Sequence, residues 1–283
     1  MTVVNDLPAT VTNAVVDRPR RAARFDTGAI VWTTGTLVGL MILWIVATDV
    51  LQLVPERVLP SPSAVAGKFV QVLVEPFAGA TLGGHVLASL GRWLSGVLIA
   101  IVVGVPLGFI LAWIPVVRAI VAPVFELLRY IPPFAWIPIA VLWMGANTSA
   151  QALVVFIAAF PAIVINSRLG VTQVDPLLVK AARTTGAGSA RILASVVGPV
   201  AAASAFTGVR IGFGNGWMAL VGAELIVGKQ GLGNLILQGQ VNLSTPIIIV
   251  GMICIAVVAT VFDIILQRIQ RLLFSWAPKN KGN

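Results

Sequence analysis

Six long apolar segments, separated by short polar stretches, constrain this chain more than any single motif does. They cover about residues 29–51, 89–113, 131–147, 149–166, 197–224 and 246–267. A membrane-spanning helix needs about 20 apolar residues, because lipid satisfies no backbone hydrogen bond. Apolar residues make up 58% of the chain and charged residues only 10%, so one water-soluble core cannot bury the apolar surface. The sequence therefore predicts an all-α, polytopic membrane protein with about six transmembrane helices.

The third and fourth apolar segments are short and contain several prolines. These are Pro132, Pro133, Pro138 and Pro161. A broken helix at membrane depth needs protein or a water-filled cavity around its freed backbone groups. The pattern indicates a translocation path in the middle of the chain, with Pro133, Trp136 and Trp217 as candidate lining residues. Simple kinking, with both tryptophans packed in a static bundle or against lipid, is the alternative.

The distribution of basic residues predicts the orientation in the membrane. With both termini in the cytoplasm, 14 of the 19 basic residues fall on the inner side, as the positive-inside rule requires. The chain then divides into a basic cytoplasmic tail (1–28), a transmembrane domain (29–267) and a second cytoplasmic tail (268–283). The net charge of +9 reflects this topology and contact with anionic lipid, and it does not indicate a nucleic-acid partner.

One polar stretch, residues 175–199, lies between the fourth and fifth segments on the cytoplasmic side. Asp175 is a favourable N-cap, and Pro176 suits the first position of a short helix. Gly186 can end that helix in the left-handed conformation, and Ser189 can cap a second helix. The sequence predicts two coupled helices within about residues 175–196, which form either a docking surface or an ordinary amphipathic loop.

The same stretch resembles the coupling motif of ABC importer permeases. That motif is Glu-Ala-Ala, three residues, Gly, nine residues and then Ile-x-Leu-Pro. The matching positions are Lys180-Ala181-Ala182, Gly186 and Val196-Val197-Gly198-Pro199. Two positions depart from the motif: Lys180 replaces the acid, and Gly198 replaces the leucine before Pro199. The reversed charge at Lys180 bears on any ion pair that the family's acidic position makes with its ATPase.

Three other stretches resemble the subfamily that imports sulfonates, taurine, nitrate, bicarbonate and related small anions or aromatic acids. They are LPSPSAV at 59–65, FELLRYIPPFAWIPIAVLWMG at 125–145, and AEL with GLG at 223–225 and 231–233. The resemblance implies a type I ABC importer permease fold with a cytoplasmic coupling helix, in a bacterial inner membrane. It also implies a non-catalytic transport subunit that forms the path for a small anion.

The implied partners are two ABC ATPase subunits, a second permease copy in a homodimer, and an extracytoplasmic solute-binding protein. This chain contains no GxxxxGK[ST] phosphate-binding loop, so ATP and Mg²⁺ are expected to act at the ATPase, with no cofactor on this chain. The implied coupling residues are Leu177, Lys180, Ala181, Ala182, Arg183, Gly186, Arg191 and Pro199. The 225–245 loop is expected to face outward and contains a flexible glycine-rich turn, which is the candidate contact with the binding protein, through Lys229, Gly231 and Gly233.

Ionisable residues within the spans are candidates for function. Arg210, in the fifth span, can attract an anionic substrate, or it can pair with Glu126 or a backbone carbonyl, or extend to the inner interface. Glu224 lies about 21 Å further along the same helix, which excludes a direct pair with Arg210. We expect Asp263 to pair with Arg268 or another inner basic residue, and His85 to lie at the interface or in a loop.

Two other function classes remain as alternatives. An ion-gradient-driven transporter or channel usually has an internal repeat and an acidic or histidine relay at the membrane midplane, and neither is visible here. An intramembrane enzyme needs a converging catalytic set, which the single histidine and scattered acids do not form. One cysteine, Cys254, leaves no cysteine cluster for a metal site.

Overall fold

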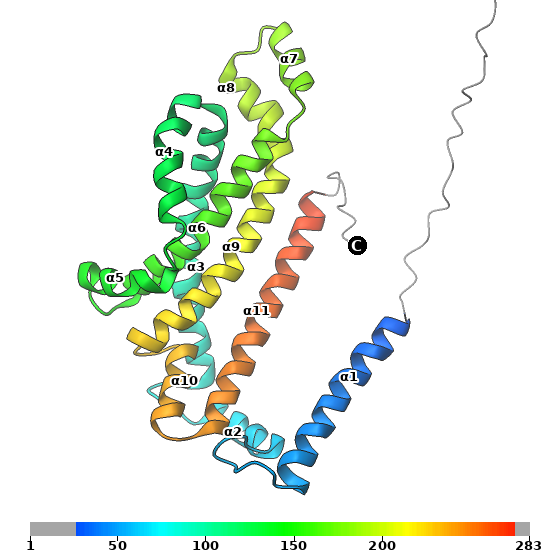
Figure 1. The fold of residues 1–283 in the computed structure, drawn as a ribbon, viewed down its shortest axis with the longest axis vertical. Coiled ribbons are helices and arrows are strands. Elements are labelled where there is room, and N and C mark those ends of the chain that lie inside the picture. Colours follow the sequence, from blue (N-terminus) through cyan, green and yellow to red (C-terminus); the bar gives the residue numbers. More distant parts are fainter. Residues whose placement is uncertain (1–26, 275–283) are drawn as a thin grey trace, which may run out of the picture.

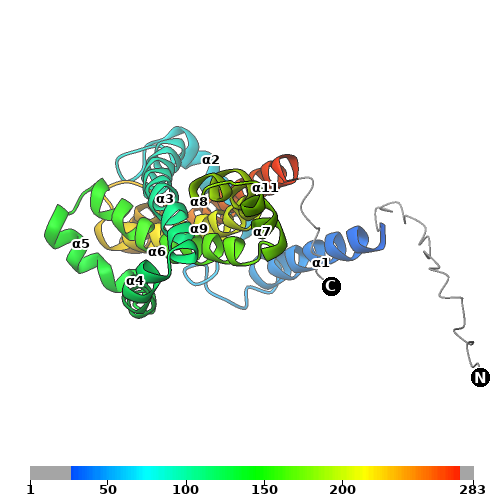
Figure 2. The same ribbon diagram turned by 90° about the horizontal axis from the view of Figure 1, so that it is seen from above.

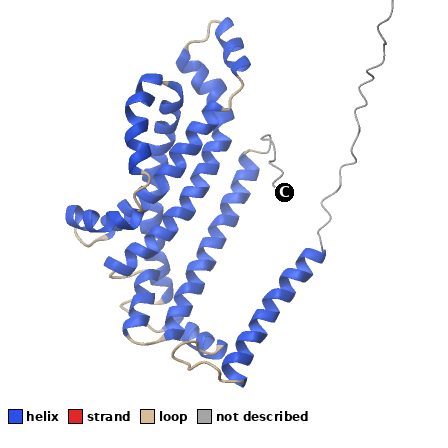
Figure 3. Ribbon diagram, in the orientation of Figure 1, coloured by secondary structure: helices blue, strands red, loops and turns tan. Residues whose placement is uncertain are grey.

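The computed structural model describes residues 27–274, and its regular elements within that range are all helices (Figures 1 and 3). The predicted all-α class is confirmed for these residues. Most of the two predicted tails, residues 1–28 and 268–283, lies outside the described range, so the division into tails and membrane domain stays a prediction.

Eleven α-helices follow one another within the described range. They are α1 (Thr27–Ile45), α2 (Pro62–Val74), α3 (Leu82–Trp113), α4 (Pro115–Leu128), α5 (Ile137–Met144), α6 (Thr148–Thr172), α7 (Pro176–Thr184), α8 (Ser189–Ile192), α9 (Gly198–Val227), α10 (Leu232–Val241) and α11 (Thr245–Leu273). Wider π-helical turns extend α1 (Val46–Val50) and join α8 to α9 (Leu193–Val197). A short 3₁₀ segment, Pro133–Trp136, leads into α5.

Helices α3, α6 and α9 form the centre of the bundle, with α6 packed along α3 on one side and α9 on the other. Glycines allow this close approach. A Cβ on Gly108 would lie 2.5 Å from Cβ of Ser167, and one on Gly208 would lie 2.5 Å from Cβ of Asn166. Small residues at helix contacts are the usual means of packing in membranes, where no hydrophobic driving force draws helices together.

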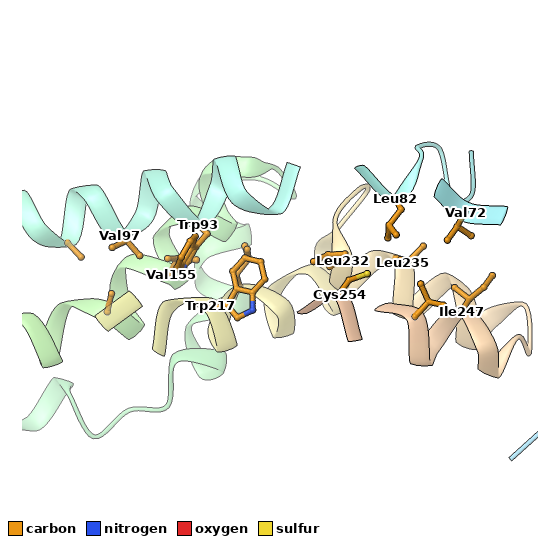
Figure 4. Close-up of a cluster of buried hydrophobic side chains, with 14 of the residues drawn as sticks. Val72, Leu82, Trp93, Val97, Val155, Trp217, Leu232, Leu235, Ile247 and Cys254 are labelled. Carbon is orange, nitrogen blue, oxygen red and sulfur yellow. The ribbon is translucent and has the colours of Figure 1, made fainter. Parts of the chain in front are cut away.

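Trp93 and Trp217 lie next to each other within the buried apolar core (Figure 4). Trp93 makes edge-on contacts with Phe213, Trp217 and Phe262 at ring-centroid distances of 4.9, 5.1 and 4.7 Å. The indole N–H of Trp217 donates to the carbonyl oxygen of Ile255 at 3.2 Å. Trp217 is only 3% exposed, so its side chain belongs to the packed core of the protomer, and its role in a path stays a prediction.

Four helices within residues 27–274 are long and apolar enough to span a membrane: Leu82–Trp113, Thr148–Thr172, Ser189–Val227 and Thr245–Leu273. A bent pair, Pro115–Leu128 with Pro133–Met144, can form a fifth span, and the first predicted segment contains the shorter apolar helix Thr34–Val50. The predicted count of six therefore stays a prediction.

The prolines in the middle of the chain act differently from one another. At Pro132 and Pro133 the chain turns by 93° between α4 and α5, so the predicted break is confirmed there. At Pro161 the helix does not break. Helix α6 contains this proline and is 25 residues long, which is longer than the predicted segment 149–166. A proline removes one helical hydrogen bond and disfavours the helical conformation of the residue before it; Pro132, which precedes Pro133, has a ψ of 136° and is not helical.

Helix α1 stands apart from the bundle in both views (Figures 1 and 2). Many of its apolar side chains are exposed, among them Trp32, which is 79% exposed. Its lower end is held by a hydrogen bond of 3.0 Å from the indole N–H of Trp44 to the carbonyl oxygen of Pro60, just before α2. Such an apolar helix surface is compatible with lipid around it.

Candidate functional site

The stretch 175–199 is here called the inner hairpin, because the basic residues predict that it faces the cytoplasm, and its first helix forms as the sequence predicts. The Asp175 carboxylate accepts a hydrogen bond from the Leu177 amide at 2.8 Å, and Pro176 begins α7. Gly186 follows the helix with φ of +81°. Its amide donates to the carbonyl oxygen of Arg183, and the amide of Ala187 donates to that of Ala182. This is the paired hydrogen-bond pattern of a left-handed glycine helix stop.

The second helix of the inner hairpin begins differently from the prediction. Ser189 is the first residue of α8, and Gly188 occupies the N-cap position without a side-chain hydrogen bond. The chain then passes through the wider turn Leu193–Val197, and α9 begins at Gly198, with Pro199 in its first turn. The end of the motif therefore marks the point where the hairpin joins the longest bundle helix after α3.

The inner hairpin has one face packed on the bundle and one face open. Val179, Ala182 and Ala187 pack on a small apolar cluster built around Val174 and Ile192. On the other face, Leu177 is 69% exposed. The remaining exposed motif residues are Lys180, Ala181, Arg183, Gly186, Arg191 and Pro199. Of the eight predicted coupling residues, only Ala182 is partly buried.

At the opposite end of the bundle lies a second polar constellation, here called the outer polar cluster: His85, Ser89, Arg92, Glu224 and the backbone of Gln230–Gly233. The Glu224 carboxylate accepts hydrogen bonds from Arg92 Nη1 at 2.8 Å, from Ser89 Oγ at 2.8 Å and from the Gly233 amide at 2.9 Å. Glu224 is fully buried. A buried carboxylate survives only when its lone pairs are satisfied, and this one also lies at the N-terminus of α10, where amides favour an anion.

Further hydrogen bonds connect the other members of the outer polar cluster. Arg92 donates to the carbonyl oxygen of Gln230, and Ser89 Oγ accepts from the Leu232 amide at 2.9 Å. His85 Nδ1 accepts from the Gly231 amide at 3.0 Å, so Nε2 carries the proton and donates to the Phe77 carbonyl at 2.8 Å. The cluster joins α3 to α9 and α10.

Three expectations need correction here. His85 is neither interfacial nor in a loop: it is fully buried in α3. Gly231 and Gly233 do not form a flexible outward turn, because both are buried and their amides bind His85 and Glu224. The predicted contact of these two glycines with a binding protein is therefore wrong for this protomer, while Lys229 is exposed.

Arg210 has a partner other than those predicted from the sequence. Its guanidinium donates to both carboxylate oxygens of Asp263 on α11, at 2.7 and 3.2 Å. Asp263 therefore does not pair with Arg268, and Glu126 pairs with Arg129 at 2.5 Å instead of with Arg210. The predicted absence of an Arg210–Glu224 pair is confirmed, since Glu224 binds Arg92.

The predicted path residues at the α4–α5 bend lie near the end of α9. Phe134 covers Gly222 of α9 so closely that a Cβ on that glycine would lie 2.1 Å from its ring. Beside Phe134, Pro133 and Trp136 are half-buried. The Trp136 indole nitrogen is buried and has no hydrogen-bond partner among the described residues. The unpaired donor of Trp136 lies at a helix break, beside Pro133. Pro133 and Trp136 are therefore stronger candidates for lining the path than Trp217.

Within residues 27–274, no group of three or more histidine, cysteine, aspartate or glutamate side chains is arranged to hold a metal ion. Both acids that the bundle places among its long helices, Glu224 and Asp263, are already paired with arginines.

Comparison with known proteins places these features in a wider set. Residues 104–276 match the family model described as binding-protein-dependent transport system inner membrane component. The chain is 36% identical over 244 residues to the taurine transport system permease protein TauC of Escherichia coli, covering 86% of this chain and 88% of that protein. It is 33% identical to the nitrate import permease protein NrtB of Synechocystis, covering 72% and 76%.

Among solved structures, the fold matches a chain of the inward-facing MetNI methionine ABC transporter with a TM-score of 0.58. The match covers 66% of this chain and 93% of that chain at 19% identity. Sequence identity this low makes the match a statement about the fold only, and it agrees with the bundle of long helices described above.

Proposed function

Because this chain belongs to the family of binding-protein-dependent transport system inner membrane components, the permease subunits of ABC importers, we propose that it forms the membrane path for a small anion and couples it to a separate ATPase through the inner hairpin. It is a multi-pass inner-membrane subunit without catalytic activity of its own, and ATP acts at the partner ATPase.

The observation that carries the coupling role is the shape of the inner hairpin. Its first helix, α7, packs Val179 and Ala182 on the bundle and leaves the opposite face, with Leu177, Lys180 and Arg183, exposed. Small side chains at Ala181 and Gly186 let another surface approach the backbone closely. The hairpin continues directly into α9, so a displacement of the docked surface would be transmitted along a helix of 30 residues. A rigid helix between two sites is a physical means of coupling them.

The assembly that fits this role contains two copies of the chain, one ATPase on each inner hairpin, and a solute-binding protein on the opposite side. ATP and Mg²⁺ would act at the ATPases. Both termini and the inner hairpin would face the cytoplasm, as the basic residues predict. Lys229, exposed beside the buried glycines, is the retained candidate for contact with the binding protein. The path would run past Pro133 and Trp136, at the bend between α4 and α5.

The substrate class follows from the relatives. TauC is named for taurine and NrtB for nitrate, and both substrates are small and carry an anionic group. We therefore propose a small anion of the sulfonate, taurine, nitrate, bicarbonate or aromatic carboxylate class as the substrate of the complete importer. Arg210 is a weaker candidate for contacting this anion, because Asp263 already neutralises it.

The test is reconstitution of the chain with its ATPase and binding protein in proteoliposomes. The cognate binding protein is first screened by thermal shift with taurine, nitrate, bicarbonate, butanesulfonate and benzoate. We expect co-purification of the ATPase and uptake of the ligand that stabilises the binding protein, only with ATP inside the vesicles. Uptake by this chain alone, without ATPase or ATP, would show that the assignment is wrong.

A matched pair of variants tests the inner hairpin itself. Gly186→Val places a β-branched residue where the backbone is left-handed, with φ of +81°. Gly188→Val places the same residue where φ is −71°, a value that any residue adopts. Neither added Cβ would meet another atom within 4 Å. We expect Gly186→Val to retain ATP hydrolysis but lose most of the uptake per ATP, and Gly188→Val to remain near wild type.

A further inference from the structure

A groove on the inner half of the bundle lies between the end of α3, α4 and the last turns of α6, with a volume of about 310 Å³. Here it is called the arginine groove. It is lined by Leu111, Phe125, Glu126, Arg129, Val164, Ile165, Arg168, Leu169 and Thr172. Leu111 and Val164 are each 1% exposed and lie beneath the surface, so the apolar floor that a ligand can touch comes from Ile165 and from Leu169, which is 45% exposed. The charged side chains come from two helices that are far apart in sequence.

The two arginines of the groove differ in their partners. Arg129 is paired with Glu126, and its guanidinium also lies 4.7 Å from the centre of the Tyr130 ring. Arg168 is half-buried and has no hydrogen bond or ion pair with any described residue. Arg92 and Arg210, the two arginines deeper in the bundle, each bind a carboxylate. Arg168 is thus the cation beside a concave surface whose charge no residue of the described chain neutralises.

The position of Arg168 makes this absence of a partner informative. It lies in α6, four residues before the helix ends at Thr172 and therefore about 6 Å along the axis from that end. An arginine this close to the end of a membrane segment binds an anion or extends its guanidinium to water at the interface, because lipid tails cannot solvate it. The arginine groove supplies a surface for an anion, with Thr172 at the same end as an additional hydrogen-bonding side chain.

We propose that the arginine groove is a binding site for a small organic anion, held by Arg168 and resting its apolar part on Ile165 and Leu169. The volume is at the small end of ordinary ligand pockets, which begin at about 300 Å³. A sulfonate or carboxylate with a short aliphatic or aromatic body matches both the apolar floor and the single free guanidinium. Nitrate and bicarbonate, which have no apolar body, match only half of this surface.

This inference rests on the proposed function and deepens it, since it places a substrate site on the cytoplasmic half of the path. The same chemistry, one anionic group with an apolar body, also describes a phospholipid of the inner leaflet. The narrow volume favours the small molecule: a lipid headgroup can reach Arg168 only with its two chains left outside the groove. The experiment therefore measures both ligands.

The probe is radiolabelled 1-butanesulfonate, measured by equilibrium dialysis against the permease–ATPase complex without nucleotide, in nanodiscs of phosphatidylcholine alone. We expect binding that neutral 1-butanesulfonamide does not compete for. Arg168→Gln should weaken binding by about ten-fold, the loss of one charge-assisted contact. Arg118→Gln is the matched control, because Arg118 also lies on the inner part of the bundle without a partner but does not line the groove.

A second variant strengthens the test because it predicts a gain. Glu126→Gln removes the carboxylate that neutralises Arg129 and leaves a neutral amide of the same shape. Two free guanidinium groups should then face the anion, and butanesulfonate should bind about three-fold more tightly. A misfolded complex cannot produce tighter binding. Equal or weaker binding by Glu126→Gln would count against the proposal.

Phosphatidylglycerol nanodiscs supply the other arm, in which native mass spectrometry counts retained anionic lipid. If Arg168→Gln releases phosphatidylglycerol but leaves butanesulfonate binding unchanged, the groove is a lipid site and the proposal is overturned. Equal losses in Arg168→Gln and Arg118→Gln would also overturn it. Both results leave co-purification of the ATPase intact, whereas a failure of the proposed function would appear as loss of the ATPase itself.

Discussion

Charged side chains in the outer polar cluster and at the inner end of the bundle differ in burial and in pairing. In the outer polar cluster, Arg92 and Glu224 have side chains that are 10% and 0% exposed, and each is hydrogen-bonded to its neighbours. At the inner end, Lys180 and Arg183 of the hairpin are exposed, and Arg168 in the groove has no partner in the described chain. Arg92 is thus buried and paired, whereas Arg168 is unpaired and Arg183 is exposed.

This difference indicates that the outer polar cluster holds helices together, whereas the inner end offers a surface for binding. A buried ion pair with all its hydrogen bonds satisfied contributes specificity of packing, since moving either helix would leave an unpaired charge in an apolar medium. The outer polar cluster therefore holds α3, α9 and α10 as one unit. Cations without partners impose no such constraint, and they can be neutralised by a ligand or another subunit. We expect motion and binding to concentrate at the inner end.

The largest expected effect comes from breaking the buried pair. Arg92→Leu leaves the Glu224 carboxylate buried with only Ser89 and the Gly233 amide, and should cost about 3–5 kcal/mol of folding free energy. The yield of folded protein and the midpoint of thermal unfolding in detergent measure the loss. The double variant Arg92→Leu with Glu224→Leu should recover much of it. A double variant as unstable as the single one would mean that the pair is not a coupled unit.

The second comparison places the same substitution at two left-handed glycines. In Gly231→Ala, the new Cβ would lie 2.3 Å from a Glu224 carboxylate oxygen, so the cluster must shift, at a cost of about 1–3 kcal/mol in addition to the strain at φ of +128°. In Gly186→Ala nothing lies within 4 Å, and only the left-handed strain of about 1 kcal/mol remains. Thermal unfolding of both variants should rank them in this order. Equal losses would contradict the crowding around Glu224.

The contrast between these two glycines also explains what the sequence could predict. The inner hairpin is local: Asp175, Pro176 and Gly186 each determine the backbone within a few residues, so the first helix and its end were predictable. The outer polar cluster is not local. Glu224 meets Ser89 from 135 positions earlier in the chain, and no sequence spacing reports that contact. A glycine-rich turn was therefore predicted to be flexible, although it wraps a buried carboxylate.

The ion pairs also show that contacts between different helices could not be predicted from the sequence. Helix length excluded an Arg210–Glu224 pair, because that argument concerns a single helix. The choice between Glu126, Arg268 and other partners depended on how helices pack against one another, and it was wrong for both Arg210 and Asp263. One signal was available for the outer polar cluster: a histidine and an arginine seven residues apart, His85 and Arg92, place two polar groups on one face of α3.

A third variant sharpens the contrast between buried and half-exposed pairs. The side chains of Arg210 and Asp263 are 35% and 48% exposed, so water replaces part of what the pair loses. Asp263→Ala should cost at most about 1 kcal/mol, several-fold less than Arg92→Leu. A double-mutant cycle with Arg210→Ala isolates the pair itself. A coupling as large as that of Arg92 and Glu224 would show that this pair is desolvated in the assembled importer, for example beneath a second copy.

The smallest expected effect concerns Lys180, where the family motif has an acid. The side chain is exposed on the free face of α7, so Lys180→Glu should leave the unfolding midpoint unchanged. The substitution reverses the charge at position 180, beside Arg183. The docking surface of the partner ATPase is expected to complement the positive charge of Lys180. An exposed pair contributes about 0.2–1 kcal/mol, so the ATPase should bind a few-fold more weakly, and less so at high salt. In a pull-down titration, the affinity of Lys180→Ala for the ATPase should lie between those of the unsubstituted chain and Lys180→Glu. If Lys180→Glu bound the ATPase more tightly, the docking surface of the partner would be basic, and Lys180 would be a residue that limits affinity at this contact.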